Sequence, residues 1–75
     1  MWSKGILEID GVKVEYQVKH YEEGSTFGIE EGKISKLFCY VGRDEVINYD
    51  RGEWSKKPKT AVSRKAYKAL LERFN

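Results

Sequence analysis

Two side chains in this sequence are of types that could act as catalytic groups, and each of these residue types occurs once. His20 is the only imidazole base available to a serine or cysteine nucleophile, and such a pair must lie within hydrogen-bond distance. Nothing in the pattern places Cys39 beside His20, and a free cysteine is commonly a small core residue. We therefore expect no enzymatic activity, no catalytic residue and no cofactor.

Two doublets of glutamate could in principle supply oxygen ligands to a hard cation; they are Glu22, Glu23, Glu30 and Glu31. A calcium loop needs ligands at alternating positions around a glycine, whereas the side chains of adjacent residues point in different directions. Gly24 and Gly28 lack the Gly-Lys-Ser/Thr ending of a phosphate-binding loop. Residues 22–32 are accordingly predicted to form a solvated loop without a metal site, held to the body of the protein by Phe27 and Ile29.

Positive charge is concentrated in the C-terminal third of the chain. Residues 1–50 carry six basic and ten acidic side chains, whereas residues 51–75 carry eight basic and two acidic ones. The candidate surface for nucleic acid or another anion consists of Lys56, Lys57, Lys59, Arg64, Lys65 and Lys68. Cations in the first turns of a helix oppose its macrodipole, so this charge does not serve helix stability. It forms either an ordinary solvated face or a surface for an anionic partner.

The segment Ser55-Lys56-Lys57 precedes a helical pattern, and together they resemble the last segment of double-stranded-RNA-binding domains. In that family, lysines at the N-terminus of the helix bind phosphates. The sequence departs from the family at Pro58, which interrupts the segment, and at its start, where a hairpin replaces the first helix. The resemblance implies a phosphate-binding role for Lys56 and Lys57.

The segment 48–54 combines aromatic and charged side chains. Tyrosine, tryptophan and arginine are the residue types that most often anchor protein interfaces. The candidate protein interface therefore consists of Tyr49, Asp50, Arg51 and Trp54. The alternative is that Trp54 packs under a helix while Asp50 and Arg51 form a surface ion pair.

The N-terminal residues 2–20 have the pattern of a β-hairpin. Apolar and polar residues alternate along its second half, as in a strand with one buried face. Asp10-Gly11 is a favoured two-residue turn, which places Ile9 opposite Val12. In this register one face is apolar and the other pairs opposite charges, and a shift of one residue would destroy both patterns.

Two further strands are predicted at residues 33–41 and 45–50. The first carries apolar side chains on both faces, the second of these faces being formed by Phe38 and Tyr40. This indicates a central strand or one covered on both sides. Turns of two, three or four residues around 42–44 all give acceptable pairs, so the register of this second hairpin stays open.

Residues 51–59 are predicted to be a loop closed by Pro58, and Thr60 is a good N-cap for a helix from about residue 61 to 74. The fold class that follows is α+β: a four-stranded antiparallel sheet of two hairpins, with one C-terminal α-helix packed on one face. The expected core consists of Leu7, Ile9, Val12, Val14, Tyr16, Val18, Leu37, Cys39, Val62, Ala66, Leu70 and Phe74.

A chain of 75 residues is expected to form a single domain, residues 1–75, with a thin core. One cysteine excludes an intramolecular disulfide, which fits a reducing cytoplasm. The N-terminus has no long apolar run, so we expect no signal peptide and no membrane contact. A homodimer would supplement the small core.

Three features together resemble a family of small uncharacterised bacterial and bacteriophage proteins. They are the opening hairpin, the stretch from Phe27-Gly28-Ile29 to Leu37, and Tyr49-Asp50-Arg51-Gly52 followed by Trp54. Glu53 separates this tryptophan from the glycine, one residue more than the resemblance predicts. The resemblance covers nearly the whole chain and implies a short cytoplasmic protein encoded by a phage or mobile element, with no catalytic residues.

Two functions of different classes are consistent with these observations. The first is a protein-binding accessory module, phage-encoded and modulating a host or defence protein, with segment 48–54 as its interface. The alternative is a nucleic-acid-binding module that uses the basic C-terminal loop and helix, whose affinity would fall steeply with salt.

Overall fold

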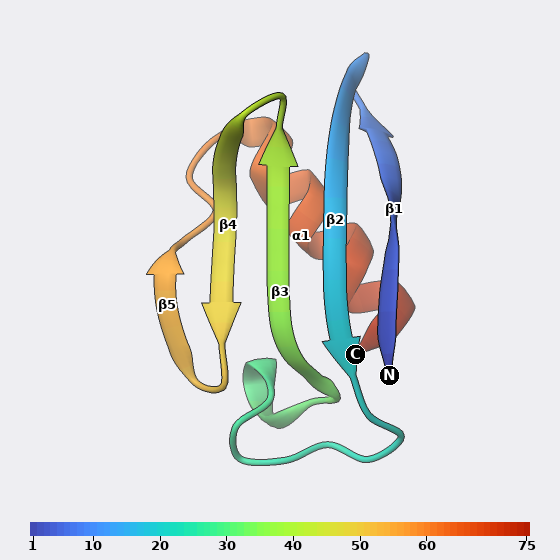
Figure 1. Ribbon diagram of the computed structural model, residues 1–75, viewed down its shortest axis with the longest axis vertical. Helices are drawn as coiled ribbons and strands as arrows, with labels where there is room; N and C mark the ends of the chain where they lie inside the picture. Colours follow the sequence, from blue (N-terminus) through green and yellow to red (C-terminus); the bar gives the residue numbers. More distant parts are fainter.

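Five antiparallel strands form one sheet, and a single helix lies across one of its faces (Figure 1). The computed structural model describes residues 1–75. The strands lie side by side in chain order and are β1 (Trp2–Ile9), β2 (Val12–His20), β3 (Ile34–Val41), β4 (Asp44–Asp50) and β5 (Glu53–Lys56). The helix α1 spans Ala61–Phe74, and a short 3-10 turn, Ile29–Glu31, lies between β2 and β3.

The first hairpin is confirmed in its predicted register, from Ile9 opposite Val12 to Trp2 opposite Lys19. The turn residue Asp10 has a φ of 50°, in the left-handed region that aspartate tolerates. Burial alternates strictly along β1, as expected for a strand with one face on the core.

The second hairpin has a two-residue turn, with Val41 opposite Asp44. Its register changes one residue pair further on, because Cys39 faces Ile47 while Tyr40 faces Glu45. Val46 is therefore the extra residue of a β-bulge. The bulge explains why turn length alone could not determine this register.

The prediction of four strands is wrong, because a fifth short strand, β5, occupies part of the expected loop 51–59. It pairs with β4 through a tight turn in which Arg51 and Gly52 both have positive φ, 48° and 99°. Such a turn normally has Asn, Asp or Gly at its first position. Because Arg51 stands there instead, the turn and the strand after it were not predicted from the sequence.

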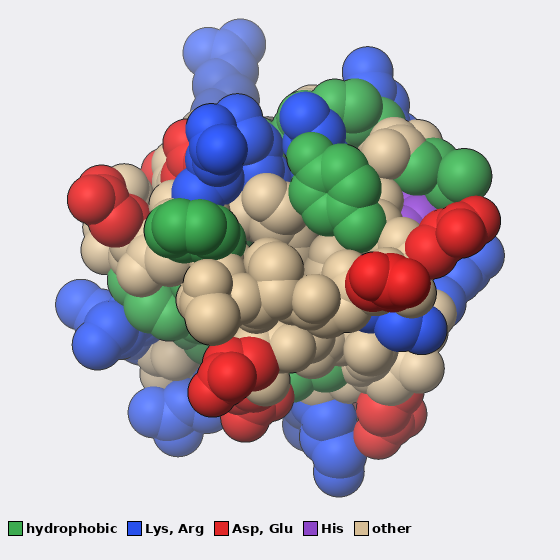
Figure 2. Space-filling model, turned by 90° about the horizontal axis from the view of Figure 1, so that it is seen from below, with side chains coloured by type: hydrophobic (Ala, Val, Ile, Leu, Met, Phe, Trp, Pro, Cys, Tyr) green, Lys and Arg blue, Asp and Glu red, His purple; other side chains and the backbone are tan.

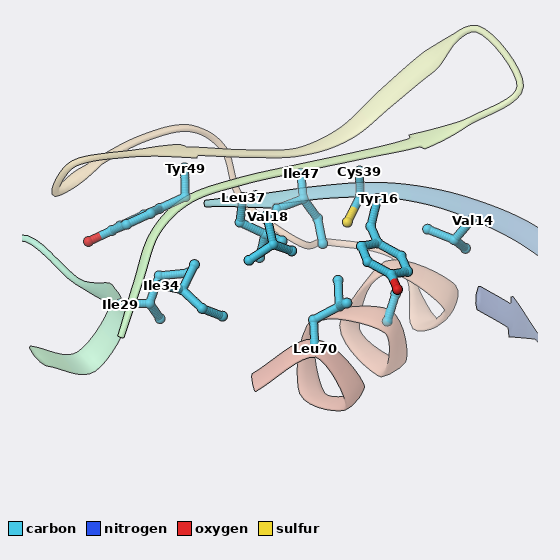
Figure 3. Close-up of a cluster of buried hydrophobic side chains, with 11 residues drawn as sticks. Val14, Tyr16, Val18, Ile29, Ile34, Leu37, Cys39, Ile47, Tyr49 and Leu70 are labelled. Carbon is cyan, nitrogen blue, oxygen red and sulfur yellow. The ribbon is translucent and has the colours of Figure 1, made fainter. Parts of the chain in front are cut away.

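The core lies between the sheet and α1, with inward side chains of β2, β3 and β4 meeting the helix (Figure 3). Seven of the twelve expected core residues are buried, whereas the other five are only half-buried: Leu7, Ile9, Val12, Val62 and Phe74. The core residues that the prediction left out are Ile29, Ile34, Ile47 and Tyr49. Ile29 holds the 22–32 segment to the core as expected, whereas the side chain of Phe27 is 60% exposed, against the prediction.

Candidate functional site

All six residues of the candidate anion surface are exposed, and we call them together the basic surface: Lys56, Lys57, Lys59, Arg64, Lys65 and Lys68. They run from β5 through the connecting loop onto α1. Only Lys65 forms an ion pair, with Asp10 in the β1–β2 turn at 2.7 Å. The other five are therefore free of protein carboxylates and available to an external anion.

The helix orients this surface because its opposite side is anchored in the core. Ala66 and Leu70 are fully buried against the sheet, and Ser63 is 1% exposed. Arg64 and Lys68, one turn apart, consequently share the solvent-facing side. The exposed side of α1 thus presents two cations one turn apart, Arg64 and Lys68, followed after a further turn by the exposed Glu72.

The helix begins as predicted, at a capping box between Thr60 and Ser63. The Ser63 N–H donates to Thr60 Oγ1 at 3.1 Å, and the Thr60 N–H donates to Ser63 Oγ at 3.0 Å. Lys56 lies on β5 and Lys57 in the loop, so neither belongs to the first turn of the helix. The resemblance to double-stranded-RNA-binding domains does not extend to these positions.

The candidate protein interface divides into buried and exposed parts. Tyr49 is 4% exposed, and its hydroxyl donates to the Phe27 carbonyl at 2.8 Å. Trp54 is half-buried, with its ring 4.9 Å from that of Tyr49 and 5.6 Å from that of Tyr67. The contact with Tyr67 of α1 agrees with the alternative, in which Trp54 packs against the helix, and Tyr49 is almost completely buried.

Asp50 and Arg51 are the exposed part of the candidate protein interface. They do not pair with each other, because the ion pair of Asp50 is with Lys36, at 3.6 Å. Arg51 lies at the tip of the β4–β5 turn, where its backbone N–H donates to the Ser35 carbonyl at 2.8 Å. Its side chain is thus left free at a fixed position.

The two residues considered for catalysis lie far apart on the sheet. Cys39 is fully buried opposite Tyr16, and burial raises its pKa to about 12. His20 is four residues further along β2, or roughly 13 Å at 3.3 Å per residue. Its Nε2 lies 2.9 Å from Ser3 Oγ and its ring 4.9 Å from that of Phe74, so it packs at the end of the core.

The sheet face opposite the helix carries an aromatic pair that the sequence interpretation missed. The rings of Trp2 and Phe38 stack at 6.3 Å across β2, and the Lys19 ammonium lies 6.0 Å from the Trp2 ring. Ile6, which lies on the same face further along β1, is 61% exposed. The sequence feature that could have revealed this pair is the second apolar face of β3, formed by Phe38 and Tyr40. The strand β3 is central in the sheet, as predicted, but no further layer covers this face.

The end of the molecule formed by the segment between β2 and β3 carries mixed charge. Figure 2 shows neutral groups and backbone at its centre, with acidic and basic side chains around them. Glu30 and Glu31 are exposed in this segment. No group of three potential ligands from His, Cys, Asp or Glu is close enough to hold a metal ion.

The fold and its surfaces define a two-layer α+β domain with an antiparallel sheet and a C-terminal helix. The chain belongs to the family described as Domain of unknown function (DUF7678), which matches residues 1–75. No curated protein and no solved structure matches it. The structure contains no helix of the length and apolar character needed to span a membrane.

Proposed function

We propose that this protein is a nucleic-acid-binding module that contacts phosphates through its basic surface. The observation that carries the proposal is the charge of residues 56–68, which hold six basic side chains and no acidic one. All six are exposed and only Lys65 is paired within the protein. Lysine and arginine that neutralise phosphates release counterions, which supplies most of the affinity of non-specific nucleic-acid binding.

The test is fluorescence anisotropy with labelled double-stranded RNA, double-stranded DNA and single-stranded RNA over a range of salt concentrations. Binding should weaken steeply with salt. The double variant Lys57→Gln, Arg64→Gln should lower the slope of log affinity against log salt by about 2, because each lost phosphate contact removes about 0.9.

A matched control is Lys13→Gln, Arg43→Gln, which removes the same charge outside the basic surface. Both of these residues are exposed. The control should keep the wild-type slope. Absence of binding at low salt, or equal slopes for the two double variants, would show that the basic surface is not a nucleic-acid site.

A second candidate function is a protein-binding accessory module, encoded by a phage and acting on a host or defence protein in the cytoplasm. The observation that favours it is Arg51, a non-glycine residue held at a φ of 48° with an exposed side chain. Such a conformation costs about 1 kcal/mol and is often retained where the side chain has a function. Arginine is also a frequent anchor of interfaces.

Arg51→Asn separates this role from stability, because asparagine tolerates the left-handed conformation. The variant should be at least as stable as the wild type and should lose a partner that wild-type protein recovers from nuclease-treated bacterial lysate. Arg43→Asn, in the turn between β3 and β4, is the control and should retain that partner. If both variants and the wild type recover the same proteins, Arg51 is not an interface residue.

A further inference from the structure

The two edges of the sheet differ in how they are protected. The edge strand β5 has four residues, pairs through a register shift and is followed by Pro58 and lysines. Short length, bulges, lysine and proline are the features that prevent an edge from pairing with another chain. The other edge, β1, has eight residues, contains no proline and pairs with β2 without a register shift; its one lysine, Lys4, is accompanied by Glu8.

The free backbone groups of β1 belong to its even-numbered residues. Met1 and His20 exchange two backbone hydrogen bonds, at 2.9 and 3.1 Å. Because bonded and non-bonded pairs alternate in an antiparallel ladder, the odd-numbered residues of β1 bond to β2. The N–H and C=O groups pointing away from the sheet are those of Trp2, Lys4, Ile6 and Glu8.

These even-numbered residues also share the face of the sheet opposite the helix, and their sequence is self-complementary. Lys4 and Glu8 flank Ile6 at equal distances along the strand. An antiparallel copy with Ile6 opposite Ile6 therefore places each lysine opposite a glutamate. Opposite charges and apolar pairs at directly facing positions stabilise a pair of strands.

We infer that β1 pairs with β1 of a second copy of this chain, with Ile6 on the two-fold axis, to form one continuous sheet across a homodimer. This register uses the free backbone groups of all three central residues, Lys4, Ile6 and Glu8. The neighbouring register, centred on Gly5, would place Lys4 opposite Ile6 and leave both charges without a partner. Ile6, 61% exposed in a single copy, would be covered by its equivalent.

The two-fold axis is perpendicular to the sheet, so both helices lie on the same face of the dimer. The basic surfaces of the two copies therefore face the same side. The dimer does not depend on the proposed function, since none of its contacts involves a residue of the basic surface. Loss of nucleic-acid binding would leave this inference unaffected.

Reversing the charge of Lys4 or of Glu8 tests the pairing of the two β1 strands. Lys4→Glu places carboxylate opposite carboxylate at both symmetric sites, and Glu8→Lys places ammonium opposite ammonium. In sedimentation equilibrium, each variant should dimerise about tenfold or more weakly than the wild type. An equimolar mixture of the two should form a heterodimer at near wild-type affinity, detected by native mass spectrometry with one variant isotopically labelled.

Lys33→Glu is the matched control, because it makes the same charge change at an exposed position outside β1, and it should dimerise like the wild type. For the register, Ile6→Cys should form an intermolecular disulfide in dilute protein much faster than Glu8→Cys. A wild type that stays monomeric at high concentration would overturn the dimer. A dimer unaffected by either β1 charge variant, or a mixture that fails to associate, would overturn the pairing of β1 strands.

Discussion

Tyr49 shows that a residue type favoured at interfaces can instead be part of the core. Its ring packs edge-on to Trp54, and its hydroxyl donates to the Phe27 carbonyl. Burial raises its pKa. Figure 3 shows the hydroxyl directed towards the segment that contains Ile29. Residue type alone therefore did not separate the buried and exposed parts of segment 48–54.

Cys39 gives a prediction for the pH dependence of stability. In the unfolded chain the thiol titrates near 9.0, whereas burial raises its pKa to about 12 in the folded protein. Between these values the unfolded chain has lost the proton and the folded protein keeps it. The free energy of unfolding should therefore fall with rising pH in this range, by up to about 1.4 kcal/mol per pH unit, with no contribution at lower pH.

The measurement is urea unfolding of wild type and Cys39→Ala at a series of pH values. The variant should be less stable at neutral pH because it leaves a small cavity. Its stability should nevertheless fall less steeply above pH 9.0. Parallel pH dependences in the two proteins would show that the thiol does not remain protonated in the fold.

Among the elements, those with strong local signals were predicted from the sequence. The first hairpin follows from Asp10-Gly11 and alternation, and α1 from Thr60 and an apolar stripe. The strand β5 was missed because it is short and its turn begins with Arg51. The β3–β4 register could not be predicted, since a bulge at Val46 leaves no trace in a period-two pattern.

The candidate surfaces were predictable to different degrees. Exposure of the helical part of the basic surface followed from helical spacing, because Arg64 and Lys68 lie opposite the apolar stripe. The stacked pair Trp2 and Phe38 could not be predicted without knowing that β1 and β3 flank β2. Strand order is a long-range property, and local periodicity contains no information about it.

The capping box gives a prediction at the level of the helix. Thr60→Ala should lower the free energy of unfolding by about 1 kcal/mol, because it leaves the Ser63 N–H without its acceptor. Thr60→Ser should lose much less. Urea denaturation measures both, with Thr26→Ala in the exposed segment before β3 as the control for loss of a threonine. An equal effect of the two alanine variants would contradict a capping role.

In the whole molecule, the segment between β2 and β3 is held by residues far away in the sequence. Tyr49 binds it at Phe27, and the Asn75 side chain binds it at Ile29 and also binds Ile34, the first residue of β3. Gly32 packs directly against the Asn75 amide, where a β-carbon would overlap with it. Asn75, which directly follows α1, therefore links the end of the helix to Ile34 at the start of β3.

This link predicts the effect of Asn75→Ala on the whole fold. Asn75 Oδ1 accepts from the Ile34 N–H at 3.0 Å, and its Nδ2 donates to the Ile29 carbonyl at 3.1 Å. Loss of both bonds should cost about 1 to 2 kcal/mol and speed hydrogen exchange at the Ile34 amide. Asn48→Ala, which removes an amide bonded only to Glu45, should leave that exchange unchanged. Unchanged exchange in Asn75→Ala would mean that the apolar burial of Ile29 and Ile34 holds this segment without the amide.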